Sequence, residues 1–267
     1  MSRISEVFAK LASGSALIPY ITAGDPHPGL TVEMMHMLVQ SGADIIELGV
    51  PFSDPMADGP VIQKASERAL LHDVGLGDVL EMVREFRRRD SSTPVVLMGY
   101  LNPIEVMGYA QFAEAAAAAG VDGVLTVDMP PEEAGDLMPL LDKYQLEPIF
   151  LIAPTTSMDR IRTICAAAKG YVYYVSVKGV TGASTLDVAS VAEKVEKIRQ
   201  CTQLPVGVGF GIKDATSAAQ IAQIADGVVV GSAIIKLVEN FSEQKDKMLQ
   251  AIAALLKDMR QAMDQRM

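Results

Sequence analysis

Cysteine, tryptophan and histidine are scarce in this sequence of 267 residues. It contains no tryptophan and only two cysteines, Cys165 and Cys201, which lie far apart along the chain. Two such cysteines argue against a disulfide framework or a thiolate metal site, and we expect each to be a small buried residue within a helix. The three histidines, His27, His36 and His72, show no metal-ligand spacing. The sequence therefore predicts no metal site, and it assigns no role to His27.

Basic clusters and long apolar runs are also missing. The chain has 23 lysines and arginines against 33 acidic residues, a formal net charge of -10, and this balance argues against a nucleic acid or an anionic membrane as a partner. Any phosphate site must therefore rely on backbone N–H groups. No run approaches the ~18 apolar residues of a membrane span, and the first residues lack the apolar core of a signal peptide. We expect a soluble, cytoplasmic protein.

Short apolar runs bounded by glycine and proline recur along the chain, which is 49% hydrophobic. Each run is typical of a buried strand, and the segments between them have apolar residues at helical spacing. The eight predicted strands are Ala16 to Ile21, Ile45 to Gly49, Val95 to Gly99, Gly123 to Val127, Pro148 to Ile152, Tyr171 to Val175, Pro205 to Val208 and Gly227 to Val230.

An additional helix is predicted before the first strand. Ser2 can cap it, and Ile4, Val7, Phe8 and Leu11 form one apolar stripe. Eight strand–helix repeats without a break in composition favour an α/β fold, a single (β/α)8 TIM barrel spanning residues 1–267. An open, doubly wound sheet is the alternative.

The stretch Ile45 to Pro60 reads IIELGVPFSDPMADGP and carries two carboxylates, Glu47 and Asp58. Because side chains alternate faces along a strand, Glu47 shares the face of Ile45 and points into an apolar interior. Burying that charge costs several kcal/mol unless the carboxylate is paired, protonated or used in chemistry. Asp58 follows in a proline-stiffened loop that can hold it over the strand end. The pair indicates acid–base catalysis; the alternative is an ion-paired core glutamate and a turn-forming aspartate.

Glycine-rich turns follow the last three predicted strands, at Gly179 to Gly182, Gly209 to Gly211, and Gly231 with Ser232. In barrels the loops after strands seven and eight, with a nearby helix N-terminus, commonly bind phosphate through backbone N–H groups. Glycine lets the backbone approach the anion closely. Together the three turns predict a phosphate site, whereas each alone is also consistent with a simple strand-end turn.

Four segments of the chain are similar to one enzyme family. ELGVPFSDPMADGP at the second strand resembles the tryptophan synthase α subunit, as do PYITAGDP at the first, YYVSVKGVTGA at the sixth and GVGFGI at the seventh. The resemblance covers essentially the whole chain. It implies cleavage of indole-3-glycerol phosphate to indole and glyceraldehyde 3-phosphate, without a metal or an organic cofactor. It also implies that indole passes to a PLP-dependent β subunit, in an assembly of two α and two β chains.

The resemblance also assigns roles to single residues. It implies that Glu47 and Asp58 are the catalytic carboxylates. Glu47 would protonate indole C3 if its apolar surroundings raise its pKa, and Asp58 would stay ionised and accept a hydrogen bond from the indole N–H. The substrate-binding residues implied are Tyr20, Tyr100, Tyr173, Thr181, Gly182, Phe210, Gly211, Gly231 and Ser232.

Two other functions remain open from the sequence. Lys178 lies just beyond the sixth strand and would serve a Schiff-base aldolase if it were desolvated, although strand parity turns it away from the interior. A phosphate-sensing barrel without turnover is the second alternative. The presence of both Glu47 and Asp58 argues against it, because binding alone requires neither carboxylate.

Overall fold

The structure is a computed structural model that describes residues 2–11, 14–176 and 187–265. In that part of the chain the sheet has nine strands, ordered β5-β4-β3-β2-β1-β9-β8-β7-β6, and every neighbouring pair is parallel. The strands are β1 (Ala16–Thr22), β2 (Ile46–Gly49), β3 (Val95–Gly99), β4 (Gly123–Thr126), β5 (Glu147–Ile149), β6 (Leu151–Ile152), β7 (Val172–Val175), β8 (Val206–Gly209) and β9 (Gly227–Val230).

The two ends of this strand order belong to one stretch of chain. β5 pairs with β4 and β6 pairs with β7, and only Phe150 separates β5 from β6. The segment predicted as one strand, Pro148 to Ile152, is therefore interrupted once and joins both edges. This closes the sheet into the predicted (β/α)8 barrel.

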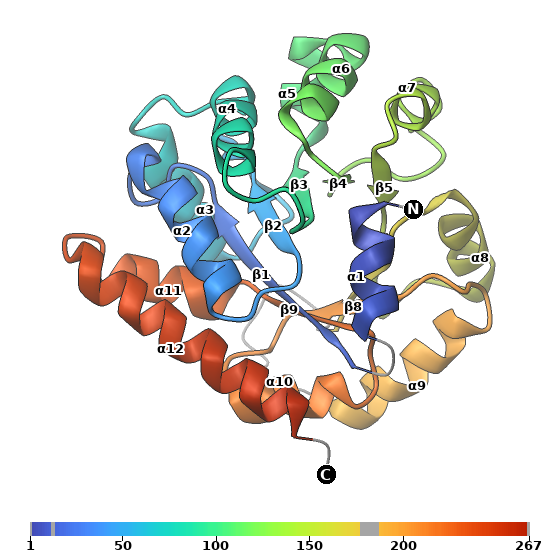
Figure 1. Ribbon diagram of the computed structural model, residues 1–267. Coiled ribbons are helices and arrows are strands. Elements are labelled where there is room, and N and C mark those ends of the chain that lie inside the picture. Colours follow the sequence, from blue (N-terminus) through green and yellow to red (C-terminus); the bar gives the residue numbers. More distant parts are fainter. Residues whose placement is uncertain (1, 12–13, 177–186, 266–267) are drawn as a thin grey trace.

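Helices surround the strands (Figure 1). They are α1 (Arg3–Leu11), α2 (Pro28–Gln40), α3 (Pro60–Leu70), α4 (Leu76–Arg87), α5 (Leu101–Met107), α6 (Tyr109–Ala119), α7 (Met138–Lys143), α8 (Met158–Ala167), α9 (Val188–Arg199), α10 (Ala215–Ala222), α11 (Ser232–Asn240) and α12 (Lys245–Asp264). In the described residues no helix has the length and apolar character needed to cross a bilayer.

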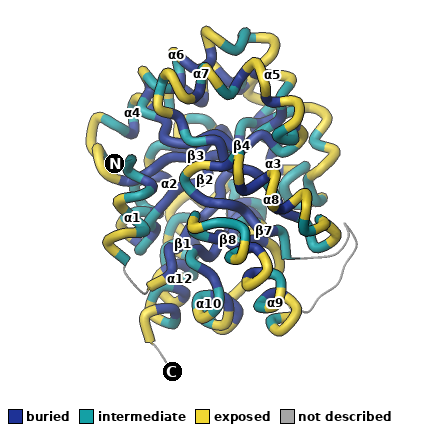
Figure 2. Tube along the Cα trace, turned by 90° about the vertical axis from the view of Figure 1, so that its right-hand side faces the viewer, coloured by how far each residue is buried: buried dark blue, intermediate teal, exposed yellow. Residues whose placement is uncertain are grey.

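Two apolar layers hold the barrel together. The larger lies between strands and helices, and it buries residues such as Ile46, Leu48 and Phe86. The smaller fills the barrel interior with Ile18, Ile45 and residues from other strands. Figure 2 shows the resulting pattern, in which buried strands are enclosed by helices whose outer faces are exposed. Alternation along each strand sends successive side chains to the two layers in turn.

Helix α1 closes the amino end of the barrel. The Ser2 hydroxyl accepts a hydrogen bond from the Ser5 N–H at 3.1 Å, as expected of an N-cap. Ile4 is fully buried in the interior layer, and the Phe8 ring lies 6.1 Å from that of Tyr171. The predicted extra helix is thus confirmed, and its apolar stripe packs against the barrel interior.

The cysteines differ slightly from expectation. Both are free, and Cys165 is buried in α8 as predicted. Cys201 is only half-buried and lies just after α9 rather than within it. Helix α9 ends at Arg199, and the chain turns through Cys201 before β8 begins at Val206.

Candidate active site

Glu47 lies on β2 and points into the barrel interior, with no exposed surface. The strand alternation explains this position, because its neighbour two residues back, Ile45, belongs to the interior layer while Ile46 and Leu48 belong to the outer one. The predicted orientation of Glu47 is therefore confirmed.

A tyrosine hydroxyl contacts the Glu47 carboxyl group. The Tyr171 hydroxyl donates a hydrogen bond to Oε1 of Glu47 at 2.6 Å, and both side chains are fully buried. The other oxygen, Oε2, has no partner among the described residues. Burial raises the pKa of Glu47 from 4.5 to about 7, although the hydrogen bond from Tyr171 acts in the opposite direction. Near neutral pH this group can therefore both donate and accept a proton.

Asp58 lies in the loop between β2 and α3, and hydrogen bonds fix its backbone. The Asp58 N–H donates to the carbonyl of Pro55 at 3.0 Å, and the side-chain amide of Gln63 donates to the backbone carbonyl of Asp58 at 2.9 Å. Gly59 then caps α3, and Pro60 occupies the first turn, where its missing N–H costs nothing. The sequence thus ends the loop immediately after Asp58.

Tyr100 supports the Asp58 carboxylate. Its hydroxyl donates to Oδ2 of Asp58 at 3.0 Å and accepts from the Ala57 N–H, also at 3.0 Å. The Phe52 ring stacks on Tyr100 with centroids 5.1 Å apart. Burial raises the pKa of Asp58 to about 6 while the Tyr100 hydrogen bond lowers it, so Asp58 is mostly ionised above that pH.

One cavity at the carboxyl end of the barrel contains both carboxylates. Most of the predicted site residues line it, and the lining comprises Tyr20, Glu47, Asp58, Ile62, Met98, Tyr173, Phe210, Gly211, Ile212, Val229, Gly231 and Ser232. Tyr100 is not in this lining and reaches the site through Asp58 instead. Thr181, Gly182 and Lys178 lie outside the described residues.

Part of the lining of this cavity has features suited to an anion. Gly231 precedes the first turn of α11, and Ser232 begins that helix. Gly211 adopts a φ of 78°, a conformation that favours glycine. Helix N-termini present unpaired N–H groups and a positive dipole end, which attract phosphate. Within the described residues no three His, Cys, Asp or Glu side chains form a potential metal cluster.

Comparison with known proteins agrees with this geometry. The family model described as tryptophan synthase alpha chain matches residues 8–264. This chain belongs to that family. It is therefore an enzyme of the lyase class that acts in tryptophan biosynthesis.

Relatives of the tryptophan synthase alpha chain family match over nearly their whole length. The alpha chain of Nitrosococcus oceani is 61% identical, covering 99% of this chain and 98% of its own. That of Thioalkalivibrio sulfidiphilus is 60% identical, with 99% and 100% covered. The crystal structure of tryptophan synthase subunit alpha from Legionella pneumophila superposes with a TM-score of 0.93 at 50% identity, covering all of both chains.

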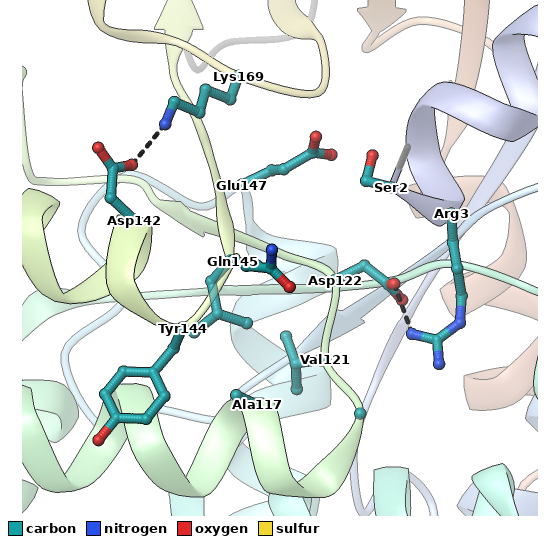
Figure 3. A pocket seen from close by; sticks show the side chains of 12 residues that line it. Ser2, Arg3, Ala117, Val121, Asp122, Asp142, Tyr144, Gln145, Glu147 and Lys169 are labelled. Atoms are coloured by element: carbon teal, nitrogen blue, oxygen red, sulfur yellow. Dashed lines mark hydrogen bonds and ion pairs between the residues drawn. The ribbon is translucent and has the colours of Figure 1, made fainter.

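A larger cavity, of about 660 Å³, lies at the opposite end of the barrel (Figure 3). Two ion pairs lie in its lining, since Lys169 contacts Asp142 at 2.5 Å and Arg3 contacts Asp122 at 2.8 Å, and Glu147 lines it as well. In barrel enzymes the amino end of the strands serves stability and the carboxyl end carries catalysis. The smaller cavity around Glu47 and Asp58 is therefore the candidate active site of this alpha chain.

Two contacts in the site were not predicted from the sequence. The sequence pattern identifies Tyr171 only as the start of a strand, and its hydrogen bond to Glu47 joins residues far apart in the chain. Strand alternation could have indicated the position of Tyr171, because Tyr171 and Tyr173 lie on the same face of the strand and Tyr173 is a predicted site residue. The bond from Tyr100 to Asp58 has no comparable local signal.

Proposed function

We propose that this chain cleaves indole-3-glycerol phosphate to indole and glyceraldehyde 3-phosphate, using Glu47 for proton transfer and Asp58 for charge stabilisation. The observation that supports this most strongly is the state of Glu47. It is fully buried, one of its oxygens has no partner in the described residues, and its pKa is raised to about 7. A purely structural carboxylate at such a position is costly, because no cationic side chain pairs with it in the described part of the chain.

The first step is protonation of the indole ring. Glu47, in its neutral form, donates its proton to C3, which leaves the ring nitrogen carrying positive charge. Asp58, in its ionised form, accepts a hydrogen bond from the ring N–H and stabilises that charge. Tyr100 is already bonded to Asp58 and keeps the carboxylate in place, so the stabilisation needs little reorganisation during the reaction.

The second step breaks the carbon–carbon bond. The Glu47 carboxylate produced in the first step accepts the proton of the glycerol hydroxyl next to the ring. The O–H electrons form the aldehyde C=O bond, and the electrons of the broken C–C bond return to the ring and neutralise it. Glu47 thus donates one proton and regains one, and the hydrogen bond from Tyr171 stabilises its ionised form between the steps.

The substrate phosphate would lie opposite the carboxylates. The turn at Gly211 and the first turn of α11 at Ser232 line the same cavity, and both can present N–H groups to an anion. Gly182 and Thr181, which belong to the same expected site, lie outside the described residues. In this proposal the indole ring of the substrate lies beside Asp58 and its phosphate beside Gly211 and Ser232.

A β subunit is the expected partner. Relatives of this chain are named as alpha chains of tryptophan synthase, which supports an assembly with a complementary chain. We propose that indole passes to a PLP-dependent β subunit and that two α and two β chains assemble together.

The test is an assay of indole release from indole-3-glycerol phosphate by the purified chain, with glyceraldehyde 3-phosphate measured in parallel. Equal amounts of the two products are expected. Asp58→Asn should be severely impaired, because a neutral amide cannot balance charge on the ring, while Asp54→Asn, a neighbouring exposed carboxylate, serves as the control. Absence of indole from the parent protein would reject the proposed reaction, and near-normal activity of Asp58→Asn would remove Asp58 from it.

A further inference from the structure

The turn that follows β8 has an unusual backbone. Phe210 has a φ of 73° and Gly211 a φ of 78°, so two successive residues adopt the left-handed conformation. Glycine tolerates this conformation, but a bulky side chain seldom adopts it unless its surroundings enforce it. Phe210 is 45% exposed as a residue, so burial does not supply that constraint. Another contact must hold the turn.

Ser176 supplies this contact from the neighbouring strand. Its N–H donates to the Gly209 carbonyl at 3.0 Å, which extends the β7–β8 pairing by one residue. Its hydroxyl lies 2.8 Å from the same carbonyl oxygen and 2.7 Å from the carbonyl oxygen of Phe210. The hydroxyl has one hydrogen to donate, which the two carbonyls share, and both carbonyls are therefore drawn toward Ser176.

The direction of these carbonyls fixes the direction of two N–H groups. In a trans peptide the C=O and N–H bonds point in opposite directions. The carbonyl of Gly209 and the N–H of Phe210 belong to one peptide unit, and the carbonyl of Phe210 and the N–H of Gly211 to the next. Because both carbonyls face Ser176, both N–H groups face away from it. Neither N–H has an acceptor among the described residues.

The unpaired N–H groups belong to residues that line the active-site cavity. Phe210 and Gly211 both contribute to its lining, next to Gly231 and Ser232 at the start of α11. Successive N–H groups that point the same way form a concave anion-binding surface. We propose that Ser176 is a positioning residue that holds the Phe210 and Gly211 N–H groups for the substrate phosphate. This inference rests on the proposed function, since it takes the phosphate of that substrate as the ligand.

The experiment separates binding of phosphate from binding of indole. Dissociation constants for glycerol 3-phosphate and for indole are measured by calorimetry, together with kcat and KM for indole-3-glycerol phosphate. In Ser176→Ala we expect about tenfold weaker binding of glycerol 3-phosphate and a similar rise in KM. Indole has no phosphate, so its dissociation constant should stay within about twofold of the parent value.

Two matched variants identify the hydroxyl as the cause. Ser176→Thr retains it and should bind glycerol 3-phosphate within about twofold of the parent, whereas the nearly isosteric Ser176→Val should behave like Ser176→Ala. Comparison of Ser176→Thr with Ser176→Val still tests the role of the hydroxyl if Ser176→Ala folds poorly. Ser41→Ala removes a buried hydroxyl at the opposite end of the barrel, where it contacts the Met37 sulfur, and should leave phosphate binding unchanged.

The strain at Phe210 provides an independent test. Phe210→Gly removes the steric cost of the left-handed turn, so Ser176→Ala should weaken glycerol 3-phosphate binding less in that background than in the parent. Unchanged phosphate affinity in Ser176→Val would overturn the proposal, as would equal losses of phosphate and indole affinity. A parent protein that binds glycerol 3-phosphate but releases no indole would refute the proposed reaction alone, and the Ser176 comparison would still be decisive.

Discussion

The carboxyl group of Glu47 links catalysis to stability at the scale of one residue. Its pKa is about 7 in the folded protein and 4.5 as an ordinary glutamate, so the folded state binds more protons between these values. The contribution of protonated Glu47 to the free energy of unfolding is fully present below pH 4.5 and is lost as the pH rises to about 7.

Stability measured against pH should reveal this group. The parent should lose about 3 kcal/mol relative to Glu47→Gln between about pH 4.5 and about pH 8, from roughly 1.4 kcal/mol per pKa unit. Urea denaturation of both proteins across that range measures the difference. Any constant offset from burying the glutamine amide cancels in the comparison. Curves that stay parallel over the whole range would show that Glu47 has no raised pKa.

Tyr171 should set the upper limit of the pH range for activity. Its hydroxyl stabilises ionised Glu47, so Tyr171→Phe should raise the pKa of Glu47 further. The mechanism needs Glu47 protonated and Asp58 ionised, which predicts a bell-shaped profile of kcat/KM with limbs near pH 6 and pH 7. In Tyr171→Phe the basic limb should move to higher pH while the acidic limb stays in place. A basic limb that does not move would mean that Tyr171 leaves the proton affinity of Glu47 unchanged.

The sequence carries enough information for some residues of the site and too little for others. Glu47 could be placed in the interior because strand alternation is local and its neighbours Ile45 and Ile46 settle the parity. The partners of the two carboxylates could not be found in this way. Tyr171 and Tyr100 reach Glu47 and Asp58 through tertiary packing, and no spacing rule relates residues that are so far apart in the chain.

At the scale of elements, an ion pair ties α3 to the end of β1. Asp25 is 1% exposed, and Arg68 of α3 donates to both of its carboxylate oxygens, at 2.6 Å and 2.8 Å. Arg68 lies in the last turn of α3, so this pair fixes the carboxyl end of that helix against the chain that follows β1. Strand and helix positions were predictable from periodicity, but this long-range pair was not.

Breaking the pair should be costly. Arg68→Met leaves the Asp25 charge buried without its partner and should destabilise the fold by about 3 kcal/mol. Lys197→Met breaks an exposed pair with Glu193 and should change stability by less than about 1 kcal/mol. Thermal and urea unfolding of both variants provide the comparison. Equal effects of the two substitutions would show that the Asp25–Arg68 pair is not a structural tether.

Strand ends show where local patterns stop being sufficient. The apolar run Pro148 to Ile152 predicts one continuous strand, yet the chain breaks the ladder at Phe150. Phe150 belongs to the outer apolar layer, and the two short strands on either side pair with different neighbours. Barrel closure decides this feature, because the same segment must join both edges of the sheet. The need for one segment to pair with both edges of the sheet cannot be deduced from the local sequence of that segment.

For the whole molecule, assembly with a β subunit should increase the turnover of this chain. The loop of Asp58 contains Met56, whose side chain is 84% exposed, and a partner packed against that loop would favour its ordered form. Coupling of ~1 to 3 kcal/mol corresponds to roughly 5- to 150-fold faster indole release. Assays of indole release with and without a β subunit measure this increase in rate. Identical rates would exclude activation by that partner.

Proton transfer by Glu47 is the step on which cleavage of indole-3-glycerol phosphate by this chain depends. The most direct measurement is kcat for indole release by Glu47→Gln, with glycerol 3-phosphate affinity measured on the same preparation. Glutamine keeps the size of the side chain and can accept the Tyr171 hydrogen bond, but it cannot transfer a proton. We expect kcat to fall by about 10⁴-fold or more while glycerol 3-phosphate affinity stays within about twofold. A kcat within about tenfold of the parent would contradict it.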